Sequence, residues 1–396
     1  MSDYVRFPEG VEEKIKEAFA KNGVAGVKEA AQTYENEWKT IPVNIAVAGR
    51  AGTGKSSFIN AVLQTTEKGG GARVGITETN DIQQFCSKRF PNLTLWDLPG
   101  VCTAKFPKET YLDQVKFQRY DMFIILADTR FTEGDLWLAR SVKDQDKRFY
   151  MVRSKLDRDY EDEANDQPEN YDGKSESEIM QIVLQIVKND ISKQLASLAE
   201  TEQVFGISVR TKYIAHFEFD TLMETVKNDA PAAKKAVFFM TLPALTENAI
   251  KNKACVLRKR IRTVSLQSAA GSLVPIPGFS LIVDKKLIDR ECKLYREQFH
   301  IDEISLAATE QEYKFKLNEF DHEIANQLRS LVTFIKKRAL HRLEITDGLA
   351  KLIPLIGLAT AAAISCGATY MILSKLLDSI EEDAIKINRK ILSNTT

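Results

Sequence analysis

The spacing of hydrophobic residues divides the chain into three regions. Residues 1–40 place apolar side chains about one helical turn apart, which predicts helices. Between 41 and 228, short apolar runs such as Val43–Ala48, Met122–Ala127 and Phe149–Val152 alternate with helical stretches. Continuous apolar runs of this length are typical of buried parallel strands. The middle region is therefore predicted to be an α/β domain, with helices on both faces of a mostly parallel sheet.

The third region, 229–396, has a helical pattern without a convincing strand. It contains two stretches without a charged residue, Thr263–Val283 and Leu352–Ser374. The second is long enough to span a bilayer, whereas Pro275 and Pro277 interrupt the first. A helix that is apolar on all sides is buried in a large domain or in a membrane. Core packing, reversible membrane insertion and a stable span are thus the alternatives for Leu352–Ser374.

Composition and charge exclude several classes of function. The chain has 55 basic and 55 acidic residues, which argues against binding nucleic acid through bulk charge. Its five cysteines are scattered and never spaced C-x-x-C, so we expect reduced thiols and no zinc site. The N-terminus shows no secretory signal, and residue 2 is Ser where N-myristoylation needs Gly. We expect a cytoplasmic protein that is not secreted.

Directly after the first apolar run, the chain matches the pattern G-x-x-x-x-G-K-[ST] between a strand and a helix. The glycines allow a tight turn whose N–H groups surround phosphate oxygens. Lys55 would supply a positive charge to the β- and γ-phosphates, and the Ser56 hydroxyl would bind Mg²⁺. The predicted nucleotide contacts in this segment are Gly49, Gly52, Thr53, Gly54, Lys55, Ser56 and Ser57.

Two further motifs indicate a guanine nucleotide, GTP or GDP. Asp97-Leu98-Pro99-Gly100 follows an apolar strand, so Asp97 would hold Mg²⁺ through water and the Gly100 N–H would meet the γ-phosphate. Ser154-Lys155-Leu156-Asp157 resembles the guanine-reading motif [NT]-K-x-D. The Asp157 carboxylate would accept hydrogen bonds from guanine N1–H and N2–H, whereas adenine would leave it unpaired. The Lys155 stem would cover the base. Serine in place of threonine predicts a looser loop tether.

The remaining site residues are predicted from their places in strand order. Ser208 and Val209 lie at the end of the next predicted strand, Val204–Val209, where a backbone N–H usually meets guanine O6. Thr77 and Thr79 lie where the first switch belongs, and Thr79 is slightly favoured as the Mg²⁺-sensing residue over an ordinary loop threonine. The position after Gly100 is Val101, although many GTPases place a water-orienting Gln there. We therefore expect slow hydrolysis that rises with protein concentration.

Arg50, inside the phosphate loop, is a candidate for stabilising charge across a dimer, the alternative being a solvent-facing loop residue. Because the water-orienting Gln is missing, a non-hydrolytic regulatory scaffold controlled by GTP and GDP is an alternative function. An ATPase is a third.

The same motifs, together with the stretches that link them, resemble the immunity-related (interferon-inducible) GTPases. The matching segments are Gly49–Asn60, Trp96–Gly100, Tyr120–Ile125, Thr129–Phe131 and Phe149–Asp157. The resemblance implies a dynamin-like fold, in which both chain ends build the helical domain. It also implies GTP-dependent dimers or oligomers, peripheral association with intracellular membranes and cell-autonomous immunity. Matching Gly75 and Glu78 to the family places its switch threonine nearer Asn80 than Thr79.

Overall fold

The computed structural model describes most of the chain in two compact units. One consists of residues before Lys39 together with Glu247–Asn394, and the other is Lys39–Thr246. The described residues are 39–65, 71–73, 81–86, 90–166, 168–195, 204–242, 244–272, 279–303, 305–307, 310 and 354–394, with scattered positions from 13 to 33. Side chains are left undescribed at 168, 195, 232–233, 266–272, 279–285, 354–366, 368 and 394.

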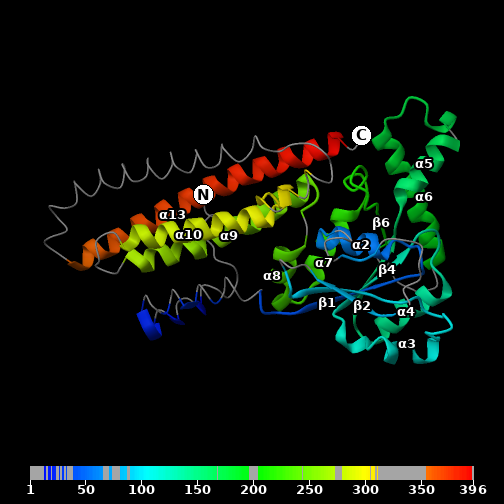
Figure 1. The fold of residues 1–396 in the computed structure, drawn as a ribbon, viewed down its shortest axis with the longest axis horizontal. Coiled ribbons are helices and arrows are strands. Elements are labelled where there is room, and N and C mark those ends of the chain that lie inside the picture. The colour runs from blue at the N-terminus through cyan, green and yellow to red at the C-terminus, as the bar shows by residue number, and fades with distance from the viewer. Residues whose placement is uncertain are drawn as a thin grey trace. The chain divides into compact units, whose positions relative to one another are not determined.

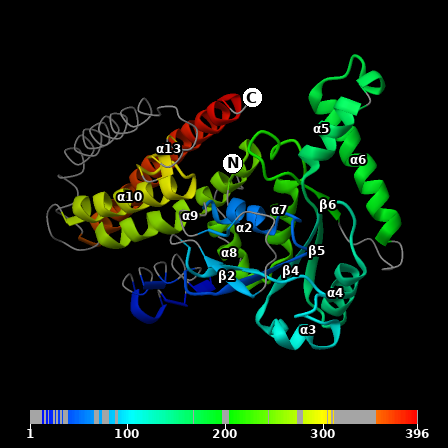
Figure 2. The same ribbon diagram turned by 45° about the vertical axis from the view of Figure 1, so that its right-hand side comes forward.

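A six-stranded sheet forms the centre of the Lys39–Thr246 unit (Figures 1 and 2). Its strand order is β2-β3-β1-β4-β5-β6, and all neighbours are parallel except the pair β2–β3. The strands are β1 (Val43–Ala48), β2 (Gln83–Cys86), β3 (Leu93–Asp97), β4 (Met122–Ala127), β5 (Arg148–Arg153) and β6 (Val204–Gly206). The strands that follow β1 in sequence lie on both sides of it, β3 on one side and β4 on the other, so the strand order reverses at β1. Ligands are expected at such a point, outside the carboxyl ends of the strands.

Helices cover both faces of this sheet, as the apolar runs predict. Phe123 and Ile125 of β4 pack with residues of α3 and α4 in one hydrophobic cluster. On α2 and α7, the rings of Phe58 and Phe219 lie 6.2 Å apart. The helices of the unit are α2 (Lys55–Leu63), α3 (Lys108–Gln114), η3 (Phe117–Arg119), α4 (Glu133–Asp144), α5 (Leu156–Asp166), η4 (Pro168–Tyr171), α6 (Glu176–Leu195), α7 (Phe219–Asp229) and α8 (Ala232–Thr241).

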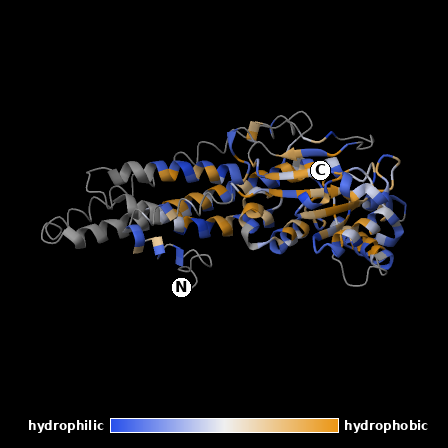
Figure 3. Ribbon diagram, turned by 90° about the horizontal axis from the view of Figure 1, so that it is seen from below, coloured by the Kyte–Doolittle hydropathy of each residue, from blue (hydrophilic) through white to orange (hydrophobic). Residues whose placement is uncertain are grey.

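The other unit is built around three long helices, α9 (Glu247–Ser272), α10 (Phe279–Gln298) and α13 (Pro354–Asn394), which lie side by side (Figures 1 and 2). Along α9, the buried apolar residues recur at intervals of three and four, which is the period of one helix face: Ile250, Ala254, Leu257, Ile261 and Val264. Arg258 of α9 pairs with Asp378 and Glu381 of α13, at 2.7 and 2.5 Å. Figure 3 shows hydrophobic and hydrophilic residues alternating along these helices where they are coloured. The predicted fold class is thus confirmed.

The charge-free stretches are described in part. None of the helices that the structure describes is long and apolar enough to cross a membrane. In Leu352–Ser374, however, side chains are described only at 367 and from 369 onward, where Leu373 is fully buried and Met371 is 55% exposed. The alternatives for that stretch therefore stay open. In Thr263–Val283, side chains are described only for residues 263–265, of which Thr263 and Val264 are fully buried.

Candidate nucleotide-binding site

The loop between β1 and α2 has a backbone that depends on glycine. Gly49, Gly52 and Gly54 have φ values of 140°, 82° and 90°, a region that residues with a Cβ atom rarely adopt. At Gly49, an added Cβ atom would lie 2.2 Å from the Leu126 carbonyl oxygen of β4, so no larger residue fits. Gly54 caps the N-terminus of α2. The motif thus produces the sharp strand-to-helix turn that its sequence predicts.

Lys55 is held by the loop that it belongs to. Its Nζ atom donates to the carbonyl oxygens of Gly49 and Arg50, at 3.0 and 3.1 Å, and lies 3.9 Å from Asp97 Oδ1. The side chain is only 5% exposed. Burial lowers the pKa of this ammonium, while the nearby charges of Asp97 and Asp135 act in the opposite direction. The amino group is therefore fixed at the position where the motif requires a positive charge.

The register of the sheet brings Asp97 beside the phosphate loop. Asp97 ends β3 opposite Val47 of β1, and the Ser56 hydroxyl on α2 donates to Asp97 Oδ2 at 3.5 Å. A hydroxyl and a carboxylate oxygen side by side are ligands that suit Mg²⁺, which is usually held by few protein groups with phosphate and water completing its shell. The donor set thus fits the ion that the sequence predicts.

Two hydrogen bonds anchor the start of the loop after β3. The backbone N–H of Leu98 donates to the Val47 carbonyl at 2.9 Å, and the buried Tyr111 hydroxyl of α3 donates to the Pro99 carbonyl at 2.8 Å. An added Cβ atom at Gly100 would lie 3.7 Å from the Arg50 Cα atom, so the two loops are close together. The anchoring role of Tyr111 was not predicted, since nothing in its local sequence links it to Pro99.

Thr77 and Thr79 both lie outside the described residues. Val101 and Cys102 follow Gly100, and Cys102 has a φ of 64°. A Cβ atom at Gly134, in the first turn of α4, would lie 3.3 Å from the Val101 side chain. Val101 therefore packs against α4, which supports the interpretation that it does not orient water.

Ser154 connects the base-reading loop with the phosphate loop. Its backbone N–H donates to the Ala127 carbonyl at the end of β4, at 2.8 Å. Its hydroxyl lies 2.6 Å from the Thr53 carbonyl oxygen and 3.2 Å from that of Ala127. A hydroxyl has one proton to donate, so the shorter contact to Thr53 is favoured. Serine therefore supplies a direct tether between two loops that lie 101 residues apart in sequence.

Asp157 is buried at the start of α5, where two donors meet its carboxylate. The Ser208 hydroxyl donates to Oδ1 at 2.7 Å, and Arg210 Nε lies 3.0 Å from Oδ2. Ser208 is fully buried at the C-terminal side of β6. The sequence predicts that backbone N–H groups of Ser208 and Val209 bind the base, whereas this hydroxyl contact with Asp157 was not foreseen. The two segments predicted to read guanine thus meet at one carboxylate.

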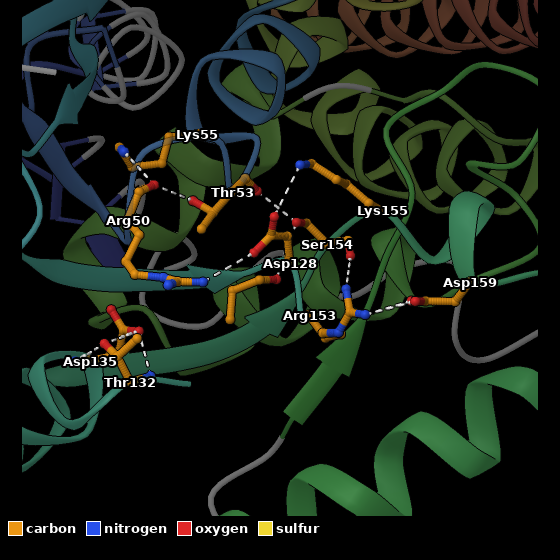
Figure 4. A network of polar contacts seen from close by, with 11 residues as sticks. Arg50, Thr53, Lys55, Asp128, Thr132, Asp135, Arg153, Ser154, Lys155 and Asp159 are labelled. Carbon is orange, nitrogen blue, oxygen red and sulfur yellow. Dashed lines mark hydrogen bonds and ion pairs between the residues drawn. The ribbon is translucent and has the colours of Figure 1, made fainter. Parts of the chain in front are cut away.

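A further carboxylate joins the two sides of the site. Asp128, directly after β4, lies 3.8 Å from Arg50 Nη2 and 3.2 Å from Lys155 Nζ (Figure 4). Lys155 has a φ of 61°. Asp128 was missed in the sequence, although its place after a buried parallel strand puts it at the same sheet edge as the motifs.

Asp135 is a second buried carboxylate near the phosphate loop (Figure 4). It forms a capping box with Thr132 at the start of α4. Burial raises its pKa, whereas hydrogen bonds from Thr132 and the charges of Arg50 and Lys55 lower it. The loop cations are thus surrounded by the acidic side chains of Asp97, Asp128 and Asp135.

A family model described as "Interferon-inducible GTPase (IIGP)" matches residues 8–391. Interferon-gamma-inducible GTPase 10 of Mus musculus is 32% identical over 356 residues, which cover 88% of this chain and 81% of that relative. Interferon-inducible GTPase 1 of Mus musculus is 32% identical over 281 residues, which cover 70% of this chain and 66% of that relative.

Among solved structures, Aquifex aeolicus Era bound to GDP and aluminium fluoride is 16% identical. The match covers 54% of this chain and 67% of that chain, with a TM-score of 0.29. A likeness of this size adds nothing to the fold described above.

Proposed function

Because the chain belongs to the interferon-inducible GTPase family and is therefore a GTP-binding GTPase, we propose that it is a slow switch that self-associates on GTP. The observation that carries this proposal is the joining of the two halves of the site. The Ser154 hydroxyl bonds to the phosphate loop, and Asp157 lies three residues farther along the same segment. A base and a phosphate chain on one nucleotide need such a fixed spacing between their binding groups.

In this proposal, Lys55 and the loop N–H groups bind the phosphates, and Ser56 and Asp97 hold Mg²⁺. When bound, the ion neutralises charge on the β- and γ-phosphates. The carboxylate of Asp157 reads guanine, and Lys155 covers the base while Asp128 holds its ammonium. The Gly100 N–H meets the γ-phosphate and reports its presence to the loop that Tyr111 anchors.

Slow and cooperative turnover is proposed from the chemistry of the residues after Gly100. Neither the Val101 nor the Cys102 side chain has the amide with which Gln orients the attacking water. A second copy of the chain would then have to complete the site. Multiple-turnover phosphate release should therefore rise per molecule when protein concentration is raised a hundredfold at saturating GTP. Constant specific activity over that range would rule out self-activation.

Arg50 is the proposed contribution of the partner copy. Its side chain is 54% exposed, and its contact with Asp128 is long at 3.8 Å. Exposed ion pairs of this kind are weak, so the guanidinium is available to leave it. Arg50→Ala should lower the activity of concentrated protein and leave the activity of dilute protein unchanged. An equal loss of activity at both concentrations would instead indicate that Arg50 acts within its own copy. No loss of activity would indicate that Arg50 is a solvent-facing loop residue.

The proposed action at membranes rests on the two charge-free stretches, Thr263–Val283 and Leu352–Ser374. We propose that GTP-dependent assembly brings Leu352–Ser374 to an intracellular membrane. Flotation with phosphatidylcholine–phosphatidylserine vesicles should recover more protein with a non-hydrolysable GTP analogue than with GDP. Equal recovery with both nucleotides would contradict a switch, and the absence of recovery would contradict membrane binding by this chain alone.

A further inference from the structure

The carboxylate proposed to read guanine already has an arginine beside it. Arg210 Nε lies 3.0 Å from Asp157 Oδ2, while the Ser208 hydroxyl donates to Oδ1. Asp157 is 4% exposed and Arg210 is 51% exposed, so an exposed cation is paired with a buried anion. We propose that Arg210 competes with guanine for Asp157 and thereby limits the affinity for guanine nucleotides, an inference that rests on the guanine-binding role proposed above.

The competition follows from the chemistry of the two groups. Guanine presents N1–H and the N2 amino group on one edge, which is a guanidine fragment within the ring. The arginine guanidinium presents planar N–H donors of the same kind. Both groups require Asp157 Oδ2, because a guanine edge pairs with both oxygens of a carboxylate. The Ser208 hydroxyl can remain on Oδ1, since each carboxylate oxygen has two lone pairs.

The neighbourhood of Arg210 provides an alternative partner. Arg210 Nη1 lies 3.3 Å from Glu161 Oε1, and the Tyr213 hydroxyl donates to the same oxygen at 3.1 Å. The structure shows both contacts at once and Glu161 is 41% exposed, so the guanidinium can stay on Glu161 through Nη1 when Nε leaves Asp157. The exposed pair contributes little by itself. Glu161 favours release of Asp157 and so favours guanine.

The size of the effect depends on how often Arg210 holds Asp157. Apparent affinity falls in proportion to the fraction of molecules in which the carboxylate is accessible. An arginine that occupies Asp157 for about 70–90% of the time would weaken binding by about threefold to tenfold. Nucleotide contacts on the phosphate side are unaffected, so the effect is confined to bases that need Asp157.

Binding of N-methylanthraniloyl-GDP and of the matching ADP probe to the full chain tests the inference. Arg210→Ala should bind the GDP probe about threefold to tenfold more tightly and faster, with no change for the ADP probe. Glu161→Gln should act in the opposite direction, because Arg210 then loses its alternative anionic partner. Lys212→Ala is the control, because Lys212 lies over the Tyr213 ring and carries the same charge as Arg210. It should leave the binding of both probes unchanged.

The outcomes separate this inference from the proposed function. If the wild-type chain prefers the GDP probe but Arg210→Ala binds it equally or more weakly, Arg210 is not a competitor, and the guanine site stands. If Lys212→Ala tightens binding as much as Arg210→Ala, bulk charge explains the effect and the inference is wrong. If the wild-type chain shows no preference for guanine, both the proposed function and the inference fail.

Discussion

The two sides of the nucleotide site are built by different means. On the phosphate side, glycine φ values shape the loop, and Lys55 bonds to carbonyls only five and six residues away. On the base side, Ser154 reaches a carbonyl 101 residues away, and Asp157 a hydroxyl 51 residues away. One side is therefore specified by a short segment, and the other by the assembled sheet. Substitutions on the phosphate side should weaken the binding of all nucleotides, and substitutions on the base side should change the preference for guanine.

The largest effect is expected at Gly49, where the backbone has no room for a side chain. Gly49→Ala places a Cβ atom 2.2 Å from the Leu126 carbonyl oxygen, so β1 and β4 must shift. We expect the free energy of unfolding to fall by more than about 3 kcal/mol and nucleotide binding to be lost. Chemical denaturation and probe binding measure the two losses.

Gly52→Ala is the matched control in the same loop. It has a φ of 82° and no atom within 4 Å of an added Cβ atom, so it should cost only backbone strain, about 1 kcal/mol. If both variants lower the free energy of unfolding equally, the positive φ, and not the short distance to the Leu126 carbonyl oxygen of β4, is the reason why position 49 needs glycine.

Lys55→Met should separate binding from stability. The ammonium is buried, and burial lowers its pKa, so the charged form is costly to the fold. We expect affinity for GDP and ADP alike to fall by about a hundredfold, while the free energy of unfolding changes little, because the desolvation cost of the ammonium is removed together with its bonds to the Gly49 and Arg50 carbonyls. Titration calorimetry and denaturation measure these quantities. The exposed Lys116→Met is the control, and a loss confined to GDP would contradict a role on the phosphate side.

Asp157→Asn should change the preferred base. The asparagine side chain has one acceptor oxygen and an NH2 group, and it carries no negative charge. The affinity for GDP should therefore fall by about fiftyfold to a hundredfold. Xanthine carries a carbonyl in place of the guanine amino group, so the Asn amide can donate to it and XDP should be preferred. Competition binding with GDP, XDP and ADP measures this. Unchanged GDP preference would show that Asp157 does not read the base.

The smallest effect is expected at Ser154, whose hydroxyl connects the two sides. Ser154→Ala removes the 2.6 Å bond to the Thr53 carbonyl, which is worth about 1 kcal/mol, or about fivefold in affinity. Ser141→Ala on α4 removes a hydroxyl that bonds within its own helix and should leave nucleotide affinity unchanged. A double variant with Asp157→Asn should lose less than the sum of the single losses if the two residues act together.

Much of the phosphate side could be predicted from the sequence because its determinants are local. The continuous run Met122–Ala127 predicts a central strand, and β4 is buried along its whole length. The glycine spacing likewise predicts the turn before Lys55. The predicted boundaries were less accurate at the sheet edge, where the run Val204–Val209 forms a strand only over Val204–Gly206. Edge strands pair on one side, so hydrophobicity defines their ends poorly.

The contacts between distant segments could not be predicted on either side of the site, because they depend on which strands become neighbours. Tyr111 meets Pro99, Ser208 meets Asp157, and Asp128 meets both Arg50 and Lys155, through the packing of the sheet. A motif predicts that Asp157 is present but not which side chains share it. For this reason the contact between Arg210 and Asp157 is apparent only in the structure.

The central claim is that this site selects guanine on one side and binds phosphates without selection on the other. Displacement of N-methylanthraniloyl-GDP from the wild-type chain by GTP and by ATP tests it most directly. We expect GTP to displace the probe at a concentration about a hundredfold lower than ATP. Displacement at equal concentrations of GTP and ATP would contradict the account, because Asp157 would then contribute nothing to the choice of base.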